Sequence, residues 1–211
     1  MDTGTQGQIQ ASVLTQHLGM RSDGTRLSNS LDSYQLKLLD AASHNGSISL
    51  AALDNMQPWL ASEFLTIAAA TNAGLSPEIS ADAALKSRAA REQKNVIYLE
   101  TMEDQIRVSA EQPDYVQLKI LTDTLEKFNV LGDDLNQIVS AWAVGRTDFL
   151  AREMVIKLKT KSPDFYKALL TDRNKKWAKI LTRYMEDSGT CLLYTSPSPR
   201  DQRGSRMPSS A

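Results

Sequence analysis

Residues 95–99 read Asn-Val-Ile-Tyr-Leu, a short run of β-branched, aromatic and aliphatic side chains. A continuous apolar run of this length is typical of a strand that is covered on both faces. Thr101 and Asp104 follow with the spacing of a helix capping box, so a helix should begin directly after the run. The pattern predicts an α/β unit with Glu100 at the carboxyl end of the strand, where α/β proteins tend to place ligands.

Helical patterns dominate the rest of the chain, with breaks at glycine and proline. The expected helices cover about residues 30–46, 58–74, 80–93, 114–129, 133–144 and 162–185, with shorter ones starting at 101 and 147. Ser30 is the expected N-cap of the first of these helices. The predicted fold class is therefore α/β (α+β), predominantly helical, with one clear strand at 95–99.

The composition is that of a globular protein with one sizeable core. The chain has 211 residues and a formal net charge of -1, which gives no reason to expect a polyanionic partner. No window approaches the roughly 18 uninterrupted apolar residues of a membrane-spanning helix. The single cysteine, Cys191, excludes a disulfide within the chain and a cysteine-rich zinc site.

The last segment differs abruptly in composition from the sequence before it. Residues 191–211 read CLLYTSPSPRDQRGSRMPSSA, rich in Ser, Pro and Arg and without apolar periodicity. The segment resembles the in-frame translation of a sequencing-library adapter, and the alternative is an ordinary disordered tail. We expect residues 1–190 to form a partial domain and residues 191–211 to be a non-native tail.

Three stretches, taken in order, resemble the TraB/GumN family (TraB/PrgY/GumN-like). They are QPWLASEFL at 57–65, GLSPEISADAALKSRAAREQKNVIYLET at 74–101 and LLTDRNKKWAKIL at 169–181. Two departures are Gln57, where lysine is expected before Pro-Trp, and Ser80, where glycine commonly precedes the small residue and Asp82. The resemblance covers about residues 2–190 and implies a parent protein with a mixed sheet flanked by many helices.

The resemblance also implies which residues belong to a functional site. Glu100 and Arg173 are the candidate supporting catalytic residues, and Asp82 and Asn174 are the candidate substrate-binding residues. Three of the four have a structural alternative: Glu100 could complement the charge of a helix N-terminus, Arg173 could be an exposed basic residue, and Asp82 could be a first-turn acid.

The family's paired Gly-x-x-His motifs, which imply a metal-dependent hydrolase, do not occur in this chain. His17 and His44 have no glycine three residues before them, and we expect surface positions for both. We therefore expect a central fragment whose motifs lie beyond both ends. No metal ligands are assigned in this chain, no cofactor is expected on it, and a divalent metal is implied only for the full-length parent.

The function implied by the resemblance is that of a fragment of a metal-dependent hydrolase or protease-like protein, inactive as given. The alternative is a non-catalytic helical module that binds a peptide or a protein. Ten basic residues against three acidic ones between Arg152 and Arg183 raise nucleic-acid binding as a rival. The lysines of this stretch do not share one helical stripe, so we expect a solvated face and no nucleic-acid partner; they are Lys157, Lys159, Lys161 and Lys167. The resemblance alone suggests an extracytoplasmic or periplasmic location, and the oligomeric state stays open.

Overall fold

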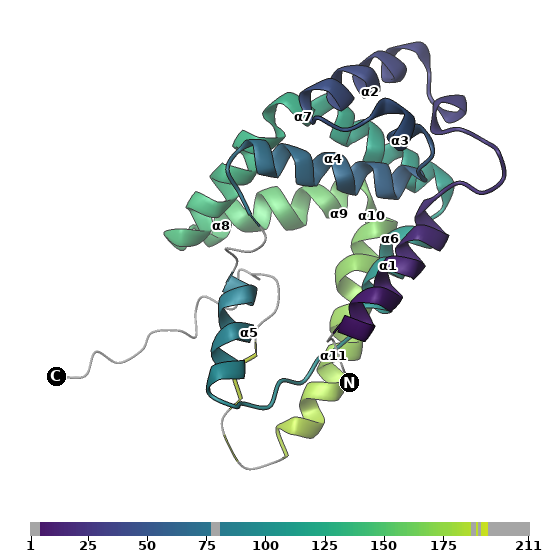
Figure 1. Cartoon of the computed structure of the whole chain (residues 1–211). Coiled ribbons are helices and arrows are strands. Elements are labelled where there is room, and N and C mark those ends of the chain that lie inside the picture. Colours follow the sequence, from purple (N-terminus) through teal and green to yellow (C-terminus); the bar gives the residue numbers. More distant parts are fainter. Residues whose placement is uncertain (1–4, 77–80, 187–188, 190, 194–211) are drawn as a thin grey trace. The chain divides into compact units, whose positions relative to one another are not determined.

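The computed structural model describes residues 5–76, 81–186, 189 and 191–193, and every regular element in these ranges is a helix (Figure 1). The chain divides into two compact units, Met1–Asp133 and Asp134–Ala211, which are described separately below. The predicted tail lies, from residue 194 onward, outside the described residues, so its assignment as non-native sequence stays a prediction. The helices of the described ranges include none that is long and apolar enough to cross a membrane.

The α/β prediction is wrong for this chain. Residues 94–98 are coil and residues 99–100 form a bend, and the only ladder contact among the described residues is an isolated antiparallel bridge between Met20 and Met56. A strand requires a hydrogen-bonded partner as well as β-prone side chains. Residues 95–99 have no such partner within the described part of the chain. The strand prediction was wrong because it used only the β-prone composition of this run.

Unit 1 contains seven complete helices and the start of an eighth among its described residues. They are α1 (Thr5–Gly19), the 3₁₀ helix η1 (Leu27–Ser30), α2 (Ser33–Asn45), α3 (Leu50–Asp54), α4 (Pro58–Asn72), α5 (Ala81–Arg91), α6 (Met102–Ala110) and α7 (Asp114–Ala143). The helix α7 begins in unit 1 and continues into unit 2. Within unit 1, α1 packs against α6, and both α2 and η1 pack against α3 (Figure 1).

The core of unit 1 forms around α4. This helix buries residues on most of its sides, as its apolar composition predicts: Trp59, Leu60, Ala61, Leu65 and Ala69 are all at most 4% exposed. They pack in one cluster with residues from η1, α2, α3 and α7, namely Leu27, Leu39, Ala42, Leu53, Leu121, Leu125 and Phe128. The Trp59 indole N–H donates to the carbonyl of Leu18, 3.3 Å away, so the buried ring also satisfies its polar atom.

Capping explains where two of the helices begin. Thr101 and Asp104 form the predicted capping box at the start of α6. The expected N-cap Ser30 instead belongs to η1, and α2 starts after Asp32, whose carboxylate accepts the backbone N–H groups of Tyr34 and Gln35. Asp32 performs the capping because its side chain reaches two otherwise unpaired donors of the first turn.

A single helix, α7, replaces the two helices that were expected on either side of Gly132. This glycine lies inside α7, where a Cβ would come within 2.8 Å of the Ala73 Cβ and 3.0 Å of the Ala69 carbonyl oxygen. Glycine is therefore present because α7 and the end of α4 approach each other closely, and not because the helix ends there.

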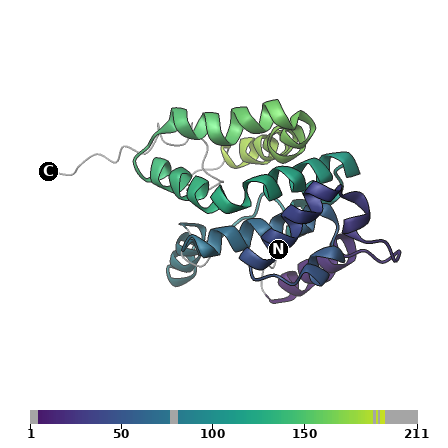
Figure 2. The same ribbon diagram turned by 90° about the horizontal axis from the view of Figure 1, so that it is seen from above.

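Among its described residues, unit 2 contains the last part of α7 and two helical rods that follow it. The first is made of α8 (Thr147–Leu150), the π-helical segment η3 (Ala151–Ile156) and α9 (Lys157–Lys161). The second is made of α10 (Pro163–Tyr166), the π-helical segment η4 (Lys167–Asp172) and α11 (Arg173–Tyr184). The rods meet at Ser162, where the chain changes direction (Figures 1 and 2). Proline at the first helical position suits this restart, because its missing N–H would have no helical partner there.

The substitution Gly132→Ala should destabilise the protein by about 1–3 kcal/mol, because the added methyl overpacks the contact between α7 and α4. The gain in helix propensity, about 1 kcal/mol, offsets only part of this cost. Urea denaturation measures the difference.

The matched control is Ser140→Ala, which adds no bulk at an exposed position of the same helix. Ala73→Gly in the Gly132→Ala background removes the opposing Cβ and should restore part of the lost stability. A Gly132→Ala variant as stable as the wild type would contradict the close approach.

Candidate functional site

Glu100 lies in the coil between α5 and α6, half-buried and directly before the N-cap Thr101. It does not stand at the end of a strand, so the expectation that placed a ligand there loses its structural basis. Two further carboxylates, Glu103 and Asp104, occupy the first turn of α6. Acidic residues are favoured at a helix N-terminus, where the unpaired N–H groups carry partial positive charge. This arrangement favours the structural alternative for Glu100.

Asp82 is the second residue of α5. Arg88 in the last turn of α5 forms an ion pair with Glu92, directly after the helix, with 2.7 Å between Nε and Oε1. The helix then ends with Gln93 at a φ of 51°, and the Lys94 N–H donates to the carbonyl of Ala89. Helix ends of this Schellman type usually carry glycine at the residue with positive φ.

Arg173 is the first residue of α11, and its guanidinium is held by two contacts from the same rod. One of its terminal nitrogens donates to the carbonyl oxygen of Leu169, 3.0 Å away. The guanidinium carbon lies 4.9 Å from the ring centroid of Trp177, within the range of a cation–π interaction. The neighbouring Asn174 is exposed. Arg173 is therefore an oriented, half-buried cation and not a freely moving surface side chain.

The sequence already contained a signal for this orientation. Arg173 and Trp177 are four residues apart, which places them on the same face of a helix. A cation–π pair between Arg173 and Trp177 could therefore have been predicted from that spacing alone.

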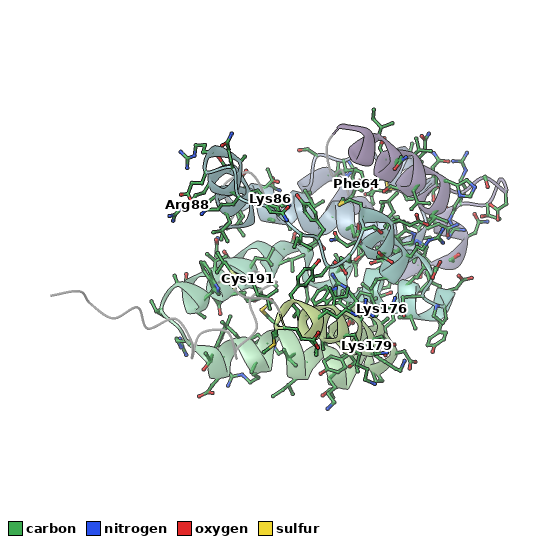
Figure 3. All side chains as sticks on the ribbon, turned by 90° about the horizontal axis from the view of Figure 1, so that it is seen from below. Phe64, Lys86, Arg88, Lys176, Lys179 and Cys191 are labelled. Carbon is green, nitrogen blue, oxygen red and sulfur yellow. The ribbon has the colours of Figure 1, made fainter. Side chains whose placement is uncertain are left out.

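The surface of α11 carries a basic stripe. Lys175, Lys179 and Arg183 follow one another at four-residue spacing, and Lys176 lies beside them; all four are exposed. Figure 3 labels Lys176 and Lys179, which both project from α11. The pKa of Asp172 is lowered chiefly by its hydrogen bond from Lys167, with a smaller contribution from Lys175 and Lys176.

The four candidate residues are divided between the two units of the chain. Asp82 and Glu100 belong to unit 1, and Arg173 and Asn174 belong to unit 2. Arg173 and Asn174 are sequence neighbours, but one is half-buried and the other exposed. The assigned catalytic and substrate-binding roles therefore remain predictions.

The described residues also do not form a metal site. No three His, Cys, Asp or Glu side chains come together among them in an arrangement that would hold an ion. His17 and His44 are exposed in the last turns of α1 and α2, respectively. The Nδ1 atom of His44 lies 2.9 Å from the carbonyl oxygen of Asp40, so that nitrogen already has a partner within its own helix.

Glu63 on α4 is a titratable group that the sequence analysis did not single out. Loss of solvent around its carboxylate raises the pKa of Glu63 above the ordinary glutamate value, and a hydrogen bond with Ser109 on α6 partly opposes this shift. Its position in a helix that is apolar on most sides was the available signal. Glu63 remains exposed as a residue, so its carboxylate lies at the rim of the core and is only partly removed from solvent.

Glu63→Gln should modestly stabilise the protein near neutral pH. Because the folded-state pKa of Glu63 is raised, the folded protein holds its proton more tightly than the unfolded chain. Wild-type stability is therefore lost as the pH rises from the ordinary glutamate value through the raised pKa. The amide cannot ionise, so the variant should not show this loss. Urea denaturation between pH 4 and pH 8 measures it.

Ser109→Ala removes the opposing hydrogen bond and should steepen the pH dependence. Glu126→Gln, at an exposed position of α7, is the matched control and should follow the wild type. If Glu63→Gln and Glu126→Gln behaved alike across the pH range, the carboxylate of Glu63 would not be desolvated.

The geometry alone does not show to which protein family the chain belongs, and comparison with known proteins does. No curated protein and no solved structure matches the chain. The model of the TraB/PrgY/gumN family matches residues 1–194, which is most of the chain. The three stretches that suggested this resemblance, at 57–65, 74–101 and 169–181, all fall within the matched range. The chain therefore belongs to the TraB/PrgY/gumN family.

Proposed function

We propose that this chain is the helical part of a TraB/PrgY/gumN-type hydrolase, and that Arg173 binds an anionic group of its peptide or protein substrate. The observation that carries the proposal is the fixed orientation of Arg173 by the Leu169 carbonyl and the Trp177 ring. An arginine held in place loses less conformational freedom when it binds a ligand.

The chemistry of the guanidinium determines the substrate group. Its planar set of N–H donors matches the two oxygens of a carboxylate, such as the C-terminus of a peptide. Asn174, the next residue, adds an exposed amide that can both donate and accept hydrogen bonds. The exposed basic stripe of α11 lowers the electrostatic cost of bringing a negative group to this helix.

The proposed role concerns the substrate and not a metal. The family resemblance implies a divalent metal, but the described residues do not fit one, since no set of ligands gathers among them. Glu100 stays a proposed supporting carboxylate, and no step through a metal is assigned to it. We expect the chain as given to bind substrate without hydrolysing it.

A second candidate function is that of a non-catalytic helical module that binds a peptide or a protein. The observation that favours it lies on α4, where Phe64 is 43% exposed and Ile67 is 59% exposed. These residues are three apart and therefore share one face of the helix (Figure 3 labels Phe64). Such a pair can serve as an anchor for an apolar ligand.

Binding of two versions of one fluorescent peptide distinguishes the candidates. The first version has a free C-terminal carboxylate and the second is amidated. For a substrate bound by Arg173, the free carboxylate should bind about tenfold more tightly, because a charge-assisted hydrogen bond is lost with the amide. Arg173→Ala should abolish the difference, and Arg173→Lys should restore only part of it. Fluorescence anisotropy measures both affinities.

Arg183→Ala removes a positive charge from an exposed position of the same helix and should retain most of the preference. Equal binding of the two peptides, lost in Phe64→Ala, would overturn the Arg173 proposal in favour of the helical binding module. Peptide hydrolysis by the chain with added Zn²⁺ or Mn²⁺, abolished by a chelator, would contradict the expected lack of activity.

A further inference from the structure

The four cations of the basic stripe on α11 have no acidic partner among the described residues. None of them makes a side-chain hydrogen bond or an ion pair there, and α11 itself contains no acidic residue. Asp172, directly before α11, takes its hydrogen bond from Lys167. Other helices compensate their cations: Arg107 on α6 pairs with both Glu103 and Glu111. The basic stripe is therefore an uncompensated patch of positive charge.

The stripe does not help α11 to form. Lys175 and Lys179 are four residues apart, as are Lys179 and Arg183, and Lys176 lies three residues before Lys179. Like charges at these spacings are neighbours on the surface of a helix and destabilise it. A sequence that breaks such a local rule is expected at a functional site. Figure 3 shows Lys176 and Lys179 projecting from the helix, where a ligand can reach them.

The spacing of the stripe matches that of side chains on an extended peptide. Four residues of an α-helix advance by about 6 Å along its axis, so Lys175, Lys179 and Arg183 place three charges in a row at this interval. In an extended peptide, alternate side chains point to the same side and are about 6.6 Å apart. The flexible stems of the two lysines can span the small difference. An extended segment with an acid at every second position can therefore meet all three cations.

Other anionic or helical partners fit this surface less well. A partner helix or a membrane surface needs exposed apolar anchors. The apolar residues of α11, namely Trp177, Ile180 and Leu181, are half-buried on a different side of the helix from the stripe. Nucleic acid is a long polyanion, and a chain with a formal net charge of -1 gives it no general attraction. A short acidic segment needs only the positive charge of α11.

We propose that the basic stripe of α11 binds an extended acidic segment of a partner peptide or protein, with carboxylates at alternate residues opposite Lys175, Lys179 and Arg183. Exposed ion pairs contribute little individually, so the affinity should be modest and should fall as the salt concentration rises. This interaction goes beyond the proposed role of Arg173, because it uses acidic side chains along the segment and does not require a C-terminal carboxylate.

Fluorescence anisotropy of the full chain with three labelled peptides tests the proposal. The first peptide alternates glutamate with serine, the second groups the same glutamates in one block, and the third replaces each glutamate by glutamine. At low salt the alternating peptide should bind about threefold more tightly than the block peptide and about tenfold more tightly than the glutamine peptide. All three are C-terminally amidated, so the contact proposed for Arg173 does not contribute. Failure of either proposal therefore leaves the other standing.

Charge removal within the stripe should weaken binding of the alternating peptide. Lys175→Gln, Lys179→Gln and Arg183→Gln should each cost about threefold in affinity, because each removes one exposed ion pair. Glutamine is a good helix former, and circular dichroism confirms that the helices remain. The matched control is Lys161→Gln, which removes an exposed cation of the same unit outside α11 and should bind like the wild type.

Several results would overturn the proposal. The first is equal affinity for the alternating peptide and for either of the other two peptides. The second is a loss of affinity in Lys161→Gln as large as the loss in Lys179→Gln, which would show attraction by net charge alone. The third is tighter binding of a single-stranded oligonucleotide or of phosphatidylserine vesicles than of the alternating peptide, which would assign the stripe to nucleic acid or to a membrane surface.

Discussion

Burial of α4 is the constraint on which the rest of unit 1 depends. A helix that is apolar on most sides has to be surrounded, and its neighbours have to approach closely enough to exclude water. The clearest evidence is the glycine at each close approach. At Gly19 a Cβ would lie 2.5 Å from Leu60, and at Gly132 it would lie 2.8 Å from Ala73. The positions of α1 and α7 thus follow from the need to cover α4.

Most of the helices could be predicted from the sequence, but few of the contacts between them could be. Periodicity and capping located α4, α5 and α6, because these signals are local and lie within a few residues of one another. Gly132 was misread as a helix end, because its role is set by Ala73, a contact that no local pattern reveals. The strand at 95–99 was misassigned for a related reason: strand formation depends on a partner elsewhere in space, whereas a helix satisfies its own backbone.

Only the identity of the candidate site residues could be predicted, and that prediction came from the family resemblance. The resemblance selected Arg173, but nothing in the family pattern indicated that the side chain would be fixed by the Leu169 carbonyl and the Trp177 ring. Glu63 escaped notice because a carboxylate in a mostly apolar helix could equally have pointed into solvent. Its desolvation depends on the packing of α6 against α4, which is a tertiary property.

The π-helical segment η4 affects how the second rod can change over evolution. In a π-helix each hydrogen bond spans five residues instead of four, so the segment absorbs additional length within a continuous helix. The ion pair between Lys167 and Asp172, five residues apart, matches this wider turn. The deletion of one residue within η4 can therefore be accommodated by converting the segment from π to α geometry. Arg173 and Trp177 would then keep the side of the rod on which they lie, although the chain is one residue shorter.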